Sequence, residues 1–174
     1  DYCVIDLDPH GVSFQKVIEA ALAAHEILEE IGIKHYCKTS GGNGLHIFIP
    51  LRAKYNYEQS RQFAELISLC IHKKLPDSTS LERSPKKRKK KVYLDCLQNR
   101  IGQTVVAPYV VRPRLRALVS TPLTWKEVNK GLDPSSFTLK TVLSRFKKKG
   151  DLFKDVLTTR IHMKTALARL HKLT

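Results

Sequence analysis

The chain has 174 residues, enough for one domain with a hydrophobic core, and no run of eighteen apolar residues that would predict a membrane span. Lysine and arginine total 31 against 16 acidic residues, a net charge of +15 that favours a polyanionic partner over a merely basic surface. The four cysteines form no Cys-x-x-Cys pair, so they predict no zinc site and are typical of a reducing, cytoplasmic compartment.

Apolar periodicity and turn residues predict alternating strands and helices. In chain order, we expect a strand over 2–8, a helix over 13–31, a hairpin of strands over 33–39 and 45–49, a helix over 58–73, strands over 92–97 and 104–111, a short helix from the capping box at 124–127, a short extended segment over 137–142, and helices over 143–149 and 161–172. The order β-α-β-β-α-β-β predicts an α+β fold with a split βαβ core of the ferredoxin or RRM type, followed by a basic helical C-terminal tail. We expect residues 1–174 to form a single domain within a longer chain.

Three aspartates lie in predicted strands, where an unpaired carboxylate is costly. Asp6 and Asp8 are two residues apart, so they point to one face with Cα atoms roughly 6–7 Å apart. If the strand containing Asp95 is a neighbour, all three carboxylates can meet on one surface. Carboxylate oxygens suit Mg²⁺ or Mn²⁺, and a pair of such ions serves phosphoryl transfer. The alternative is that these acids pair with the many lysines and arginines, and Asp8 precedes a Pro-His-Gly turn in which aspartate is common.

The turn over 40–44 has the sequence Ser-Gly-Gly-Asn-Gly and precedes His46. Its backbone N–H groups, a hydroxyl and the imidazole are suited to bind an anion. It is no Walker motif, because the Gly-Lys-Ser/Thr element is missing. An ordinary glycine-rich hairpin turn and a buried histidine are the alternatives.

Cations concentrate at two further positions. Six consecutive lysines and arginines over 86–91 are typical of a solvated loop, or of a surface that binds a DNA backbone or a triphosphate. Arg112 and Arg114, after the strand predicted over 104–111, are candidates for forked contacts to phosphate.

With these motifs, the chain closely resembles the polymerase domain of bacterial DNA ligase D, of the archaeo-eukaryotic primase superfamily. The resemblance rests on five segments in the same order, which are Val-Ile-Asp-Leu-Asp-Pro at 4–9, Lys-Thr-Ser-Gly-Gly-Asn-Gly-Leu-His-Ile at 38–47, Val-Tyr-Leu-Asp at 92–95, Val-Ala-Pro-Tyr-Val-Val-Arg at 106–112 and Ser-Thr-Pro-Leu-Thr-Trp at 120–125. The family's N-terminal portion, with its contacts to DNA ends, has no counterpart here. The resemblance therefore implies the catalytic core of a primase-polymerase.

The resemblance also implies roles for individual residues. Two metal ions, Mn²⁺ or Mg²⁺, would be bound by Asp6, Asp8 and Asp95. The incoming nucleotide would contact Ser40, His46, Arg88, Gln98 and Arg112. The family often has lysine where this chain has Asn43, so the resemblance implies that one phosphate contact is weakened or replaced there.

The activity that the resemblance implies is DNA-directed addition of NTPs or dNTPs to a 3′-hydroxyl by two-metal nucleotidyl transfer. The implied task is filling or extending DNA ends in non-homologous end joining, on primer-template DNA, with a fused or associated ligase and the Ku protein as partners. Two other classes remain alternatives, a nucleic-acid-binding module without catalysis and a metal-dependent nuclease. The central strands lack an aromatic pair, which argues against the first because stacking needs exposed rings.

Overall fold

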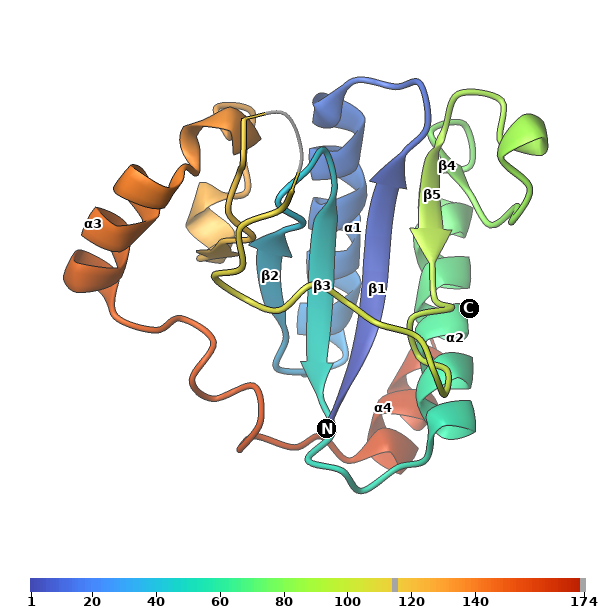
Figure 1. Cartoon of the computed structure of the whole chain (residues 1–174). Helices are drawn as coiled ribbons and strands as arrows, with labels where there is room; N and C mark the ends of the chain where they lie inside the picture. Colours follow the sequence, from blue (N-terminus) through green and yellow to red (C-terminus); the bar gives the residue numbers. More distant parts are fainter. Residues whose placement is uncertain (114–115, 173–174) are drawn as a thin grey trace.

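The computed structural model describes residues 1–113 and 116–172, and its centre is a six-stranded β-sheet (Figure 1). The strands are β1 (Tyr2–Pro9), β2 (Tyr36–Thr39), β3 (Leu45–Pro50), β4 (Thr79–Ser80), β5 (Val92–Asp95) and β6 (Pro122–Leu123). The helices are α1 (Phe14–Glu30), α2 (Tyr57–Lys74), α3 (Leu139–Lys149) and α4 (Met163–Leu170), with one-turn 3-10 helices η1 (Pro85–Lys87), η2 (Trp125–Glu127) and η3 (Pro134–Ser136).

The strand order is β4-β5-β1-β3-β2-β6, and β1 lies antiparallel to both β3 and β5. Strand β3 also pairs with β2, so β3 is inserted between the two strands that α1 connects. This inserted strand is the mark of the split βαβ arrangement, and the predicted α+β fold of the ferredoxin type is confirmed. Two-residue strands that the sequence analysis did not anticipate extend the edges, because β4 pairs parallel to β5 and β6 pairs with β2.

Helices α1 and α2 cover one face of the sheet, behind the strands in Figure 1. Alternate residues of β1, among them Cys3, Ile5 and Leu7, are buried in the core between the sheet and these helices. The intervening residues of β1 therefore point to the opposite face. On that face Val4 packs with Phe48, beneath the irregular chain that follows β5 and crosses in front of β1 and β3 in Figure 1.

Two predicted extended segments are wrong. The segment 104–111 forms no strand and contributes only an isolated bridge between Val111 and Val119. Pro108 lacks an N–H for a ladder, and Tyr109 has a φ of 66°, which a strand does not accommodate. The segment 137–142 is not extended either, because Thr138 caps a helix that already begins at Leu139.

The C-terminal part of the chain has two different helices. Helix α3 ends in three consecutive lysines, and its only buried residue is Val142. Helix α4 buries Met163, Ala166 and Leu170 in the main core and contacts α2, so it belongs to the body of the fold. No helix among the described residues is long and apolar enough to span a membrane.

Candidate metal and nucleotide site

One row of polar side chains crosses four neighbouring strands. The register pairs Asp6 of β1 with Asp95 of β5 on one side and with His46 of β3 on the other. His46 in turn pairs with Lys38 of β2. Residues that are paired across antiparallel strands point to the same face. All four side chains therefore lie on the face of the sheet away from α1 and α2.

Asp6 is the electrostatic centre of this row, with a side chain only 20% exposed. Burial, and then the neighbouring carboxylates of Asp8 and Asp95, raise the pKa of Asp6 to about 7. The positive charges of Lys38 and Arg112 offset part of this repulsion. Three carboxylates on one face are hard oxygen donors, the ligand type that suits divalent cations such as Mg²⁺ or Mn²⁺. The predicted carboxylates are thus brought to one face by two adjacent strands, as the sequence suggested.

The three carboxylates differ in their surroundings. Asp8 is 56% exposed at its side chain and lies 3.7 Å from the guanidinium of Arg88. Asp95 is half-buried at the end of β5, where its Oδ1 accepts a hydrogen bond of 2.8 Å from the backbone N–H of Leu97. This hydrogen bond to its own backbone turn fixes the orientation of the Asp95 carboxylate.

His46 lies between the acids and a buried lysine. Its Nε2 is 3.4 Å from Asp6 Oδ1, and its Nδ1 is 3.0 Å from Lys38 Nζ. Burial, together with the positive charges of Lys38 and Arg112, holds the pKa of His46 well below its usual value. His46 is therefore a neutral imidazole at physiological pH, with one N–H and one lone pair.

Lys38 decides which nitrogen of His46 bears the proton. Its side chain is fully buried, and Nζ lies 2.6 Å from Ser120 Oγ and 3.4 Å from the Thr39 carbonyl oxygen, in addition to His46 Nδ1. Ser120 Oγ donates its own hydrogen to the Thr39 carbonyl at 2.9 Å, so it accepts from Lys38. Three acceptors match the three N–H groups of an ammonium. While Lys38 is charged, Nδ1 of His46 accepts from it, so the His46 proton is on Nε2, where it faces Asp6.

No motif in the sequence pointed to a role for Lys38. The available signal was its position, since Lys38 alternates with Cys37 and Thr39 on a buried strand next to the glycine-rich turn. A lysine that is fully buried requires acceptors in the fold. Burial lowers the pKa of Lys38 to about 7, and the negative charge of Asp6 limits that decrease.

The glycine-rich turn approaches β1 closely. A Cβ atom on Gly44 would lie 2.7 Å from the Leu7 carbonyl oxygen, so only glycine fits there. Ser40 Oγ accepts hydrogen bonds from the backbone N–H groups of Gly42 (3.2 Å) and Gly44 (3.1 Å), which leaves its O–H as a donor. Asn43 is exposed at the tip of the turn.

Arg88 differs from its basic neighbours. Its guanidinium stacks on the Tyr93 ring at 3.7 Å and donates to the carbonyl oxygens of Glu82 (3.0 Å) and Arg83 (2.8 Å). The side chain is only 10% exposed, whereas the lysines on both sides of it are exposed. Of the run over 86–91, Arg88 is therefore a fixed cation beside Asp8, and the lysines surround it.

The remaining predicted residues lie around the row. Arg112 packs over Gly41, and its charge influences the pKa values of Asp6, Lys38 and His46. Arg114 lies outside the described residues.

Gln98 is not in the row itself. It lines a cavity of about 530 Å³ that also borders Tyr2 and Val4, further along the same face of β1. Asn99 is buried, and no motif in the sequence singled it out. Its side-chain oxygen accepts from the Val4 N–H (2.8 Å), and its side-chain nitrogen donates to the Val4 carbonyl oxygen (2.7 Å), so Asn99 continues the sheet beyond β5. Asn99 thus fixes the wall of the cavity on which Gln98 lies.

Comparison with known proteins identifies the family. A family model described as the LigD primase-polymerase domain matches residues 1–153. The bifunctional non-homologous end joining protein LigD of Bacillus subtilis is 40% identical over 154 residues, which are 87% of this chain and 25% of that protein. The multifunctional LigD of Pseudomonas aeruginosa is 30% identical over 172 residues, which are 97% of this chain and 20% of that protein.

A solved structure agrees with this match. The polymerase domain of Mycobacterium tuberculosis ligase D in complex with DNA superimposes with a TM-score of 0.83 at 29% identity, covering 92% of this chain and 56% of that chain. The chain spans a quarter or less of the length of these curated relatives. The chain belongs to the LigD primase-polymerase domain family.

Proposed function

We propose that this chain is a nucleotidyltransferase that adds nucleotides to the 3′-hydroxyl of DNA ends. The observation that supports it best is the pairing of Asp6 with Asp95 on adjacent strands, with Asp8 two residues along β1 on the same face. Burial and the neighbouring carboxylates of Asp8 and Asp95 raise the pKa of Asp6, and a divalent cation beside them would offset the repulsion between these acids. Family membership, and relatives named for non-homologous end joining, support the same conclusion.

The chain's own residues provide a binding site for a triphosphate. His46 donates from Nε2, Ser40 donates from its hydroxyl, and Arg88 and Arg112 supply positive charge on either side of the acids. Fixed donors of this kind stabilise charge that builds on phosphate oxygens during transfer. Two divalent ions held by the aspartates, with manganese preferred, would activate the attacking hydroxyl and neutralise the triphosphate.

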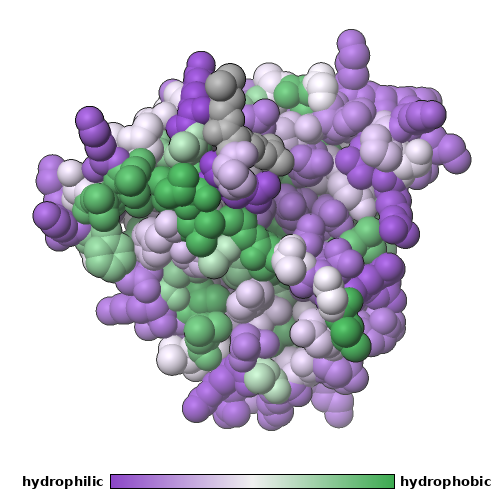
Figure 2. All heavy atoms as spheres, in the orientation of Figure 1, coloured by the Kyte–Doolittle hydropathy of each residue, from purple (hydrophilic) through white to green (hydrophobic). Residues whose placement is uncertain are grey.

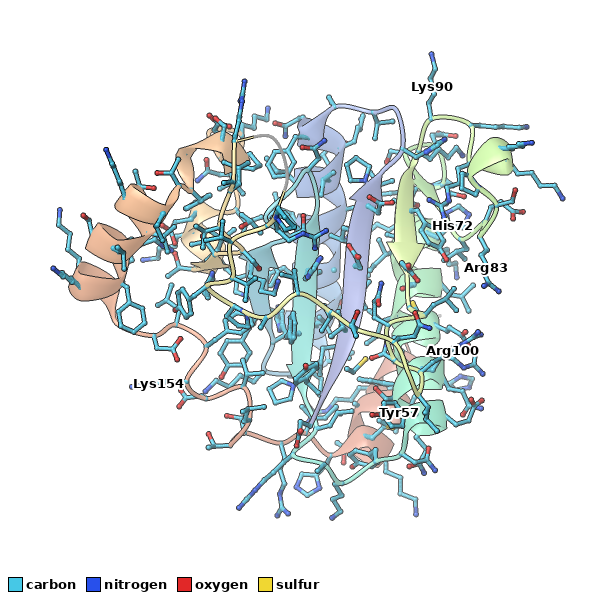
Figure 3. All side chains as sticks on the ribbon, in the orientation of Figure 1. Tyr57, His72, Arg83, Lys90, Arg100 and Lys154 are labelled. Atoms are coloured by element: carbon cyan, nitrogen blue, oxygen red, sulfur yellow. The ribbon has the colours of Figure 1, made fainter. Side chains whose placement is uncertain are left out.

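The DNA substrate would approach over the basic loop between β4 and β5. Figure 2 shows hydrophilic surface over this loop, at the upper right, and an apolar band that extends from α3 toward the middle of the face. In Figure 3 Lys90 points away from the sheet at the tip of this loop, and Arg83 and Arg100 lie along the same outer side. Exposed cations of this kind contact phosphates without reading sequence, so DNA binding would weaken steeply with salt.

The wider role follows from the family. We infer that residues 1–174 form the catalytic core of a longer protein that accepts NTPs and dNTPs, and that it works beside a DNA ligase and Ku on broken ends in the bacterial cytoplasm. Gln98 would contact the sugar or base of the incoming nucleotide from the neighbouring cavity. Asn43 would make a weaker phosphate contact than a lysine.

A single assay separates this proposal from its competitors. The protein is incubated with Mn²⁺, labelled primer-template and nucleoside triphosphates, and the primer length is measured. Extension is expected, and it should fall at least a hundredfold in Asp6→Asn and Asp95→Asn but not in Asp77→Asn, which changes an exposed acid elsewhere. Shortening of the primer would indicate a nuclease, and retention without a change in length would indicate a binding module.

A further inference from the structure

A cluster of metal-ligating side chains lies on the helix side of the sheet. His25 and Glu29 are one turn apart on α1, and His35 directly precedes β2. The Nδ1 atom of His25 is 2.8 Å from the Nε2 atom of His35, and the ligand atoms of all three side chains lie within 4.8 Å of one another. His35 alternates with Tyr36, so it faces α1, whereas Asp6 lies on the opposite face of the sheet.

The two imidazoles are held in place before any ion arrives. His35 donates from Nδ1 to the Ile33 carbonyl oxygen at 2.6 Å, which leaves the lone pair of its Nε2 directed at His25. Metal-binding histidines usually make such a hydrogen bond to a backbone carbonyl or a carboxylate. His35 is buried, and burial lowers its pKa to about 4, so the ring is neutral.

Trp125 fixes the second ring. Its indole stacks on His25 with centroids 4.1 Å apart and an interplanar angle of 4°, and its Nε1 donates to the backbone carbonyl of His35 at 3.2 Å. Glu29 is the exposed member, with a side chain that is 66% exposed and an Oε1 atom that lies 4.0 Å from His35 Nδ1. Its carboxylate would have to turn toward Nε2 of His35 to share an ion with the two facing nitrogens. Two oriented nitrogens and one exposed carboxylate would give a tetrahedral ion three ligands, and water would occupy its fourth position.

We propose that His25, Glu29 and His35 bind a borderline divalent cation such as Zn²⁺. Tetrahedral Zn²⁺ with bonds of 2.0–2.1 Å requires two ligand nitrogens about 3.3 Å apart, so the rings need to separate by only about 0.5 Å. The proton between them moves from His25 Nδ1 to His25 Nε2, so no net proton is released. The ion would tie α1 to the segment before β2. This site is independent of the proposed function, because it uses other residues on the other face.

The single tryptophan of the chain is a reporter for this site. The test uses the full chain with Asp6→Asn and Asp95→Asn, which removes the other candidate metal site. Co²⁺ or Ni²⁺ is titrated while Trp125 fluorescence is followed, Zn²⁺ is added as competitor, and calorimetry with ZnCl₂ gives the stoichiometry. The same titrations are made with His25→Asn, with Glu29→Gln, and with His162→Ala, which changes an exposed histidine elsewhere.

Saturable quenching with one ion per chain is expected, reversed by Zn²⁺. The dissociation constant should rise at least tenfold in His25→Asn and severalfold in Glu29→Gln, and stay unchanged in His162→Ala. Circular dichroism checks that each variant is folded, and the exposed Glu29 keeps the test valid if a change at His25 disturbs the stack. Quenching that does not saturate, or that has the same dissociation constant in both ligand variants, would refute the site.

Discussion

Replacing Lys38 by methionine tests how the fold controls His46. Methionine fills much of the same volume but removes the ammonium that donates to His46 Nδ1 and Ser120 Oγ. A hydrogen bond to a charged group contributes about 1.5–3 kcal/mol, and its loss frees His46 to place its proton on Nδ1. The Nε2 atom would then present a lone pair to phosphate. Since 1.4 kcal/mol is a factor of ten, we expect KM for nucleotide to rise about tenfold or more.

The same substitution should not destabilise the fold. The pKa of Lys38 falls from 10.5 to about 7, a shift that corresponds to a cost of about 5 kcal/mol for keeping this buried side chain charged. The unfolded chain binds the proton more tightly, so the stability of the natural protein should rise as the pH increases from 7 toward 10. Lys38→Met should lack this rise and should be at least as stable at pH 7.

Three measurements test this role of Lys38, which are KM for nucleotide, stability against unfolding and the His46 tautomer. Guanidinium unfolding at pH 7 and pH 9.5 gives the stability of the natural protein, of Lys38→Met, and of Lys130→Met, which changes an exposed lysine as control. The ¹⁵N chemical shifts of His46 report which nitrogen bears the proton. If Lys38→Met leaves both KM and the His46 tautomer unchanged, Lys38 does not orient the imidazole, and the reasoning is refuted.

Other parts of the structure give further expectations. Gly44→Ala should destabilise by about 1–3 kcal/mol in thermal or denaturant unfolding, because its Cβ would collide with the backbone of β1. Gly131→Ala should cost less, because its Cβ would meet only the end of the Asn129 side chain, at 3.2 Å. Arg88→Lys keeps the charge but loses the fork and the stacking, so nucleotide affinity measured by titration should fall about tenfold, and unchanged affinity would exclude a phosphate role. Partial burial raises the pKa of Glu127, but hydrogen bonds from Arg145 outweigh it and hold that pKa well below 4.5. The stabilisation is therefore complete above pH 4.5 and is lost as the pH falls, so Glu127→Gln should lower Tm at pH 7 and matter less at pH 3; equal losses at both pH values would contradict this account.

The sequence by itself determined the elements with strong periodicity and the residues that were chemically out of place. Helices α1 and α2 lie within a residue of their predicted limits, because apolar spacing and caps are local properties. Aspartates in strands can be recognised in the sequence because they are costly there. A glycine-rich turn and six adjacent cations can be recognised because they are local patterns. Local signals failed at 104–111, where the apolar run was mistaken for a strand although Pro108 cannot donate to a ladder.

Only the tertiary structure decided which of these residues act together. The pairing of Asp6 with Asp95 depends on the strand order, which brings together positions 89 residues apart in the sequence. Arg88 is distinguished from its lysine neighbours by one aromatic ring that it stacks on, and burial alone separates Lys38 from the exposed lysines. These differences arise from desolvation and from distances across the sheet, and a linear pattern of residue types contains neither quantity.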